Sequence, residues 1–281
     1  MKAAIRIAVA MTCFNRRETT LRCLRSLLAQ HDGQVEFVIY LVDDASTDGT
    51  AAAIRLEFPQ VHVIAGTGRL FWGGGMHRAL CEALRHPADF ILWLNDDVAL
   101  HPGAIALSLN AYRRTADTNP HQIMAGATTD PETGAITYSG FRRSHSRDPS
   151  KLRRVDPDPE RLLHCDTMNG NFVLMPRALA EHLGAIDPAF LHQLGDLDYG
   201  YRARAIGAGI RLLSFPVGTC AANPREMPFR KPGLNLLQRW RAIAGPLGLP
   251  LRPWSTFMWR HGGTYGLGRL ALIYAARLAG R

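Results

Sequence analysis

The chain has 281 residues, of which 47% are hydrophobic and 20% are charged, a balance typical of a folded protein and not of a disordered or low-complexity chain. Its five cysteines are scattered without a Cys-x-x-Cys pair, which argues against a zinc ribbon or a disulfide framework and favours a reducing compartment. The first apolar run lacks a cleavage site, and no apolar run approaches the ~18 residues of a spanning helix, so we expect neither a signal peptide nor a membrane span.

The net charge of +9 is concentrated at the C-terminal end. Residues 222–281 contain ten Lys or Arg and one acid, whereas residues 1–221 contain 23 of each sign. The sequence therefore predicts a neutral domain followed by a basic extension.

Strand and helix patterns alternate through the first hundred residues. Strand, helix, strand, helix at this spacing predicts an α/β fold with a parallel sheet and right-handed crossovers. The expected strands are 5–11, 35–42, 61–64 and 90–94, and the expected helices are 18–30, 50–57 and 76–84, the last after a glycine-rich loop at 66–75.

Polar residues follow four of these strands, at 12–16, 43–44, 69–75 and 95–97. Ligands of open α/β sheets bind outside the carboxyl ends of the strands, so these groups form a set of the size that a nucleotide needs. Asp96 and Asp97 end a strand that is apolar on both faces, where two carboxylates are costly unless a cation meets them. A metal site for a diphosphate is one interpretation, and a helix N-cap or Asx turn is the other. No Rossmann glycine motif follows the first strand, and there is no Walker loop.

The second half continues with expected strands at 123–128, 136–141, 172–175 and 210–215 and expected helices at 103–116, 176–184 and 197–206. Residues 142–160 carry five arginines among Ser, Asp and Pro and are expected to form a mobile loop, either a solvated excursion or a basic lid over an anionic donor. Asp196 falls at a helix N-terminus, where the helix dipole stabilises an acid.

The basic extension repeats apolar residues at helical spacing beside arginines, as in Leu237, Trp240 and Ile243 and again in Trp254 and Phe257. Basic amphipathic helices bordered by Trp are typical of membrane-surface binding. The alternative is that these faces pack on the preceding domain or on a second subunit of a homodimer. Nothing upstream is typical of a nucleic-acid module, so we expect no nucleic-acid partner.

Six stretches together resemble the inverting glycosyltransferases of family 2, which have the GT-A fold, and among them a bacterial rhamnosyltransferase-like group. They occur in the family's order and lie within residues 5–221. The resemblance implies a catalytic domain at 1–221, with a nucleotide-binding half at 1–98 and an acceptor half at 99–221, before the helical extension 222–281. The six stretches are 12–16, 42–50, 71–75, 94–97, 169–171 and 195–202.

The resemblance also implies how a sugar nucleotide is held. Asp43 or Asp44 would accept a hydrogen bond from the base, and Phe14 would stack on it. Asp97 is similar to the metal-coordinating last residue of the family's Asp-x-Asp motif, which implies Mg²⁺ or Mn²⁺ as cofactor. Asp96 would face the ribose or the donor sugar. The implied donor-binding residues are Thr12, Phe14, Asn15, Asp43, Asp44, Arg69, Trp72, Gly75, Asn95 and Asp96.

On the acceptor side, Asp196 is similar to the general base that takes the proton of an attacking hydroxyl in a single, inverting displacement. Asn169 and Gly170 lie where the family meets donor sugar and acceptor, and Asp198 is either a structural or an acceptor-binding carboxylate. The sequence departs from the family's pattern at Asn95, at Gly195 where Glu is frequent, and after the last strand, where a metal-binding His is missing.

The function implied is transfer of a sugar, with rhamnose suggested by the resemblance, from a dTDP- or UDP-linked donor to a hydroxyl of a cell-envelope glycan or lipid-linked acceptor. The implied location is cytoplasmic, peripheral at the inner face of the cytoplasmic membrane. Two alternatives are a non-catalytic, membrane-docked binding protein of the same fold and a nucleotidyltransferase, which the lack of glycine in 12–17 disfavours.

Overall fold

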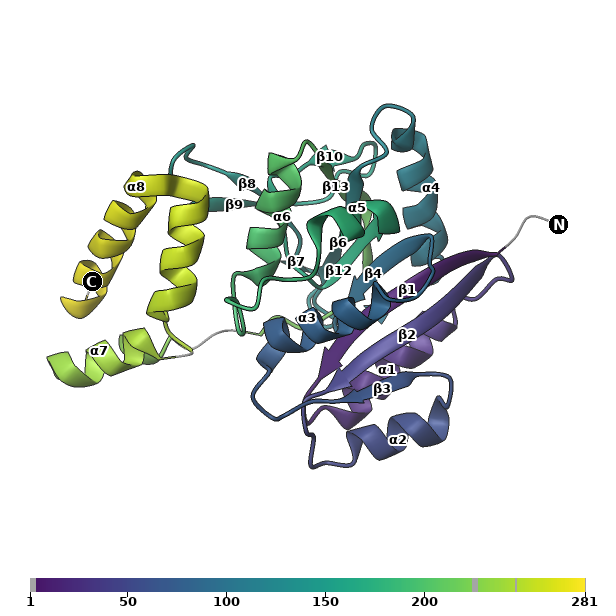
Figure 1. The fold of residues 1–281 in the computed structure, drawn as a ribbon, viewed down its shortest axis with the longest axis horizontal. Helices are drawn as coiled ribbons and strands as arrows, with labels where there is room; N and C mark the ends of the chain where they lie inside the picture. The colour runs from purple at the N-terminus through teal and green to yellow at the C-terminus, as the bar shows by residue number, and fades with distance from the viewer. Residues whose placement is uncertain (1–3, 224–226, 246, 281) are drawn as a thin grey trace.

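The computed structural model describes residues 4–223, 227–245 and 247–280 (Figure 1). The strands of the large sheet are β1 Ile5–Cys13, β2 Val35–Asp43, β3 His62–Ala65, β4 Phe90–Leu94, β5 Ala99–Leu100, β6 Gln122–Thr129, β7 Ile136–Tyr138, β10 Leu163–His164, β12 Phe172–Pro176 and β13 Gly209–Thr219. A second sheet contains β8 Gly140–Arg143, β9 Leu152–Val155 and β11 Thr167–Met168. The helices are α1 Arg17–Leu28, α2 Thr50–Glu57, α3 Phe71–Ala83, α4 Ala104–Ala116, α5 Arg177–Leu183, α6 Gly195–Ala205, the 3-10 turn η1 Pro228–Arg230, α7 Leu236–Ala244 and α8 Leu251–Leu278.

The large sheet has the strand order β10-β13-β6-β12-β4-β1-β2-β3. The strands β4, β1, β2 and β3 are parallel to one another, so their carboxyl ends meet at one edge, as the alternation of strands and helices predicts. β12 runs antiparallel between β4 and β6, and β13 is parallel to β6. The fold is therefore α/β with a mixed, mainly parallel sheet, as expected.

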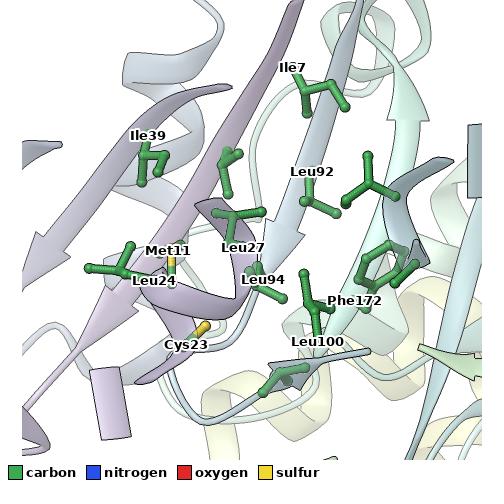
Figure 2. Packing of buried hydrophobic residues seen from close by; sticks show 14 of the residues in the cluster. Ile7, Met11, Cys23, Leu24, Leu27, Ile39, Leu92, Leu94, Leu100 and Phe172 are labelled. Carbon is green, nitrogen blue, oxygen red and sulfur yellow. The ribbon is translucent and has the colours of Figure 1, made fainter. Parts of the chain in front are cut away.

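The side chains of β1 alternate between two hydrophobic clusters, one on each face of the sheet. Ile7 and Met11 lie in a cluster that contains Leu24 of α1 (Figure 2). Ala8 and Ala10 lie in the opposite cluster, with buried residues of α3. The small side chains on this second face let α3 approach β1 closely.

The close approach of α3 explains where the sequence-based boundary was wrong. The helix predicted over 76–84 begins at Phe71 and takes in the three glycines that we assigned to a loop. Helical glycine costs ~1 kcal/mol relative to alanine, but a Cβ at Gly75 would collide with Thr12, and one at Gly73 would collide with the carbonyl of Phe190. The glycines therefore allow the start of the helix to lie against β1 and the 187–194 segment.

The predicted mobile loop at 142–160 is also partly wrong, because β9 pairs with β8 in an antiparallel register. Arg142 donates from Nε to the His164 carbonyl at 2.8 Å, and Arg154 donates from Nη1 to the Ile136 carbonyl at 2.8 Å. These two arginines bind the main chain and do not form a lid over a donor.

The C-terminal helices α7 and α8 form a unit beside the main body, and α8 is interrupted by non-helical backbone at Gly263 (Figure 1). A third hydrophobic cluster joins this unit to the body, because Phe257 and Met258 pack with Phe190 and Tyr201. Packing on the preceding domain, the second interpretation of the apolar stripes, therefore holds for this part of α8. Within the described residues, no helix combines the length and apolar character needed to cross a membrane.

Candidate active site

The loop between β3 and α3 is held at the sheet edge by Asp44. One carboxylate oxygen accepts from the backbone amides of Thr67 and Gly68 at 3.1 and 2.7 Å, and the other accepts from those of Leu70 and Phe71 at 2.9 and 3.1 Å. These four bonds occupy both oxygens, so Asp44 is committed to shaping the loop.

Asp43, at the end of β2, is buried but less committed. Its Oδ1 accepts from the Ser46 amide at 3.1 Å, and no described residue donates to its Oδ2. Of the two carboxylates that the sequence left open for the base, Asp43 is the one with an oxygen to offer.

The loop after β1 is shaped by Asn15, which has a positive φ of 50°. Its Oδ1 accepts from the Thr47 amide at 2.7 Å, and its own amide donates to the Ser46 hydroxyl at 2.9 Å. Asn15 therefore ties this loop to the one after β2. Its side-chain oxygen bonds within the protein, which favours a structural role over binding of the sugar nucleotide. In the same loop, the Phe14 side chain is 52% exposed at the sheet edge, whereas Thr12 is buried under α3. Arg69, in the loop between β3 and α3, is exposed.

The adjacent acids after β4 share one cation. Arg16 Nη1 lies 2.9 Å from Asp97 Oδ2 and 3.4 Å from Asp96 Oδ1. Asp96 Oδ2 also accepts from the Thr20 hydroxyl at 3.2 Å. Arg16 is the last residue of the first motif, and it supplies the cation that two adjacent carboxylates were expected to need.

The carboxylates retain capacity for a metal ion. Burial, and then the charge of Asp97, raise the pKa of Asp96 to about 7 in spite of Arg16 and Thr20. Asp97 Oδ1 is buried without a hydrogen-bond partner among the described residues. An unsatisfied buried carboxylate oxygen costs free energy that a hard cation would recover, so the donor set fits Mg²⁺ or Mn²⁺. The described residues contain no cluster of three or more His, Cys, Asp or Glu side chains, so a metal here would rely on donor phosphates for most of its ligands.

Trp72 connects the two ends of the site. Its Nε1 donates to Asn95 Oδ1 at 2.8 Å, next to the paired acids. Its ring lies against Gly170, where any Cβ would collide with the indole. The Gly170 amide in turn donates to Asp196 Oδ2 at 3.1 Å. The structure thus brings Asn95, Trp72, Gly170 and Asp196 into one continuous wall, as the sequence-based assignment requires.

Asp196 lies in the first turn of α6. Its Oδ1 accepts from the Leu197 amide at 2.9 Å, so each carboxylate oxygen receives a backbone donor. The helix N-terminus and these amides stabilise the carboxylate and fix its direction. The neighbouring Asn169 exchanges hydrogen bonds with the Ser139 backbone at 3.0 and 3.3 Å, which orders the β11–β12 turn.

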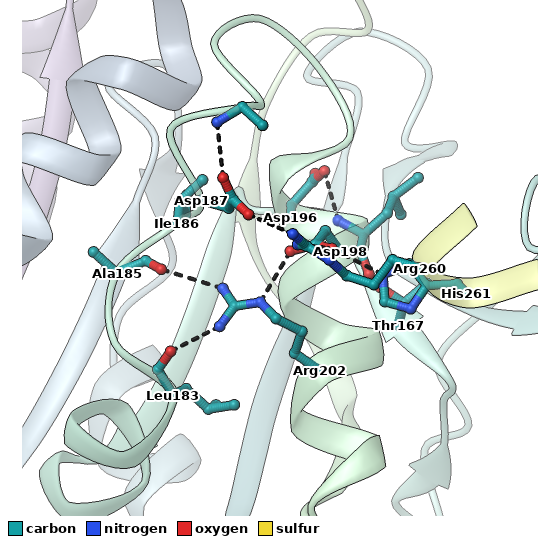
Figure 3. A network of polar contacts seen from close by, with 12 residues as sticks. Thr167, Leu183, Ala185, Ile186, Asp187, Asp196, Asp198, Arg202, Arg260 and His261 are labelled. Atoms are coloured by element: carbon teal, nitrogen blue, oxygen red, sulfur yellow. Dashed lines mark hydrogen bonds and ion pairs between the residues drawn. The ribbon is translucent and has the colours of Figure 1, made fainter. Parts of the chain in front are cut away.

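Asp198 is fully buried and meets Arg202, Arg260 and His261 (Figure 3). Arg202 Nε lies 2.9 Å from one oxygen, and Arg260 Nη1 and His261 Nε2 each lie 2.8 Å from the other. Although burial opposes ionisation, the hydrogen bond from His261 and the charges of Arg202 and Arg260 lower the pKa of Asp198. These contacts favour a structural role for Asp198 over acceptor binding, since Asp198 anchors α8 to α6.

Cys220 takes the place where the family's histidine was expected. It directly follows β13, is buried, and accepts from Asn171 Nδ2 at 3.7 Å. Burial, and then the charge of Asp97, raise the pKa of its thiol. The end of β13 therefore reaches Asp97, the residue that the resemblance predicts as a metal ligand, and no periodicity in the sequence reveals this proximity.

The α/β fold with its mixed, mainly parallel sheet is of the GT-A type. The family model for glycosyl transferase family 2 matches residues 8–181, so the chain belongs to that family. No curated protein sequence matches the chain.

Solved structures agree on the fold. GalNAc-T7, solved with UDP, GalNAc and Mn²⁺, has a TM-score of 0.60 at 14% identity, over 75% of this chain and 42% of its own. The mannosyltransferase PcManGT from Pyrobaculum calidifontis, solved with GDP-Man and Mn²⁺, has a TM-score of 0.54 at 17% identity, over 99% of this chain and 73% of its own. The chain thus spans less than half of GalNAc-T7, and at these identities the likeness shows the fold alone.

Proposed function

We propose that this glycosyltransferase works by a single inverting displacement with Asp196 as the general base. The supporting observation is the wall in which Trp72 links Asn95 to Gly170 and Gly170 holds Asp196. A hydroxyl of the acceptor that meets Asp196 would lie across this wall from the carboxylates after β4. The base would remove the proton as the hydroxyl attacks the anomeric carbon, while the nucleoside diphosphate leaves on the opposite side.

Asp97 is the residue that would hold a divalent metal, with Asp96 beside it. The metal would stabilise negative charge on the departing diphosphate. Arg16 already faces both carboxylates, so it would have to turn toward the phosphates or share the site when donor and metal bind. Its guanidinium is suited to either position, since it binds carboxylate and phosphate alike.

For the donor, we propose that Asp43 accepts the hydrogen bond of the base and that Phe14 stacks on it, with Thr12 behind and Arg69 at the rim. Asp43 has the open oxygen, and Phe14 has the exposed ring. A base with an N–H donor suits a carboxylate, and thymine, uracil and guanine all have one. A dTDP- or UDP-linked donor, with rhamnose as its sugar, is what the family resemblance suggests among these.

For the acceptor, we propose a hydroxyl of a cell-envelope glycan carried on a lipid, modified at the inner face of the cytoplasmic membrane. The basic extension supports this, because it packs against α6, the helix that carries the general base. Asn169 and Gly170 border the place where such an acceptor would enter.

Calorimetric titration of dTDP, UDP and GDP, each with and without Mn²⁺, tests the donor and metal assignments together. We expect one of the first two to bind more tightly with Mn²⁺, and NMR of the transfer product to show inverted anomeric configuration. Retention of configuration would refute the single displacement. Failure of all three nucleotides to bind would favour a non-catalytic protein of the same fold.

A further inference from the structure

The C-terminal unit uses only some of its apolar residues for packing. Phe257, Met258, Leu270 and Tyr274 are buried in the cluster that joins α8 to the body. A different set, on α7, on the segment after it and at the first residue of α8, remains exposed to solvent. Its members and their exposed fractions are Leu236 at 72%, Leu237 at 58%, Trp240 at 41%, Leu247 at 58% and Leu251 at 56%. We call this set the α7 face.

Exposed leucines and a tryptophan this close together are unusual on a protein surface that meets only water. Burying them would recover roughly 25 cal/mol per Å² of apolar area. Exposed cations lie among them, with Lys231 shortly before α7, Arg241 within it and Arg252 next to Leu251. The face is therefore amphipathic in the manner of interfacial membrane helices.

A small cavity beside α7 gathers three arginines. Arg230, Arg239 and Arg277 line about 270 Å³ together with Phe229 and Gly280. Arg277 lies over the Phe229 ring at 5.8 Å, and Arg239 Nη1 donates to the Phe229 carbonyl at 3.5 Å, so both are positioned by the same residue. Residues 227–281 contain no Asp or Glu. Like charges so close together attract an anion, and guanidinium groups match phosphate in geometry.

The segment that joins α7 to α8 lies near the active site. The Leu249 amide donates to the Ile243 carbonyl at 2.6 Å, and Gln193 Nε2 donates to the Gly248 carbonyl at 2.8 Å. Between these segments lies a second, apolar cavity of about 200 Å³ whose lining includes Phe71, the neighbour of Trp72. In Figure 1, β1 and β2 run toward the side of the molecule where α7 lies. The segment that joins α7 to α8 is therefore close to the start of α3, next to Trp72.

We propose that the α7 face docks on an anionic lipid bilayer, with its leucines and Trp240 in the interfacial layer and the three-arginine cavity holding a phospholipid phosphate. Charge complementarity selects this partner, because an apolar face set in an acid-free, arginine-rich segment fits anionic headgroups better than a neutral surface. The inference deepens the proposed function, since it brings the active site to the membrane that would carry the acceptor. Docking itself requires neither donor nor transfer.

Vesicle sedimentation of the full chain tests the proposal, with phosphatidylcholine vesicles compared with vesicles that also contain phosphatidylglycerol. We expect binding to the anionic vesicles only. Replacing three cations (Arg230→Gln, Lys231→Gln, Arg241→Gln) should weaken it about 100-fold, at ~1 kcal/mol for each charge. A second variant, Leu236→Ser with Leu237→Ser and Leu251→Ser, removes apolar contact and should also weaken binding. The matched control, Leu56→Ser with Arg114→Gln, changes an 87% exposed leucine and an exposed arginine on the main body and should bind normally.

Equal binding by the control and the two α7 variants would refute the docking surface, as would a wild-type chain that ignores both kinds of vesicle. Calorimetric binding of inorganic phosphate that needs Arg230, without vesicle binding, would assign the cavity to a free phosphate and overturn the bilayer assignment. A dimer in sedimentation equilibrium that the leucine variant abolishes, again without vesicle binding, would assign the face to a second copy. Nucleotide titration of the same variants separates these outcomes from the proposed function, because the donor site lies outside the α7 face and should bind normally.

Discussion

Two carboxylates in the first turn of α6 serve two different regions of the molecule. Asp196 turns toward the active site and receives backbone amides from Gly170 and Leu197. Asp198, two residues later, turns into the junction with α8 and meets Arg202, Arg260 and His261. Backbone amides orient the carboxylate of Asp196 and leave its negative charge without a salt bridge to these donors. The side chains around Asp198 instead form ion pairs that balance its charge. The difference separates the proposed base from a structural anchor on one helical turn.

Replacement of Asp196 by Asn is expected to have the largest effect on activity. The variant keeps the shape of the side chain but cannot take a proton, so transfer should fall by about 10²- to 10⁴-fold. Steady-state transfer assays measure this loss, and nucleotide titration should show unchanged donor binding. Full transfer activity in the variant would rule out Asp196 as the base.

Replacement of Asp198 by Asn should instead destabilise the fold. It leaves Arg202 and Arg260 without their shared buried partner, which costs about 3–5 kcal/mol in the free energy of unfolding. Urea unfolding followed by tryptophan fluorescence measures the change. The control is Asp156→Asn, whose exposed pair with Arg154 at 2.8 Å should contribute less than about 1 kcal/mol. Equal effects of the two substitutions would show that Asp198 is not an anchor.

The sequence predicts the sheet edge well because the signals there are local. The mostly apolar runs over 35–42 and Phe90–Leu94 predict β2 and β4 closely, and the acids that follow them lie at the same edge. The roles within a pair of acids depend on tertiary partners instead. Asp44 is saturated by a loop more than twenty residues away, and Asp198 meets a helix more than sixty residues away. No spacing rule could have distinguished them from Asp43 and Asp196.

The C-terminal extension shows the same limit for apolar residues. Leu237 and Ile243 fit one helical stripe in the sequence, yet the structure buries Ile243 and leaves Leu237 exposed. Periodicity identifies a helix with an apolar side, but only the packing of α7 on its neighbours decides which members of the stripe stay in solvent. The sequence could therefore not decide, for any apolar residue of the extension, between membrane binding and packing on the preceding domain.

Replacement of Asp97 by Ala is expected to have a smaller effect, on the Mn²⁺-dependent affinity for nucleotide. Asp97→Ala removes the carboxylate whose Oδ1 is buried without a partner among the described residues, so the Mn²⁺-dependent part of nucleotide affinity should disappear. We expect a loss of about 10-fold, or about 1.4 kcal/mol, in calorimetric titration with Mn²⁺ and little change without it. Nucleotide affinity that still rises with Mn²⁺ in the variant would place the metal elsewhere.

The smallest effect concerns the pH dependence of stability at Asp96. Its pKa of about 7 lies above the value near 4 of an unfolded aspartate, so between these limits the folded state binds the extra proton. The free energy of unfolding should then fall as pH rises through this window and level off above it, by about 1 kcal/mol per pH unit. Asp96→Asn cannot titrate, so its metal-free stability should gain on the wild type over this range, while Asp156→Asn should follow the wild-type slope. The opposite outcome is that the stability curves of Asp96→Asn and the wild type run parallel from acid to neutral pH. Arg16 would then keep Asp96 ionised, as Arg202 and Arg260 keep Asp198 ionised.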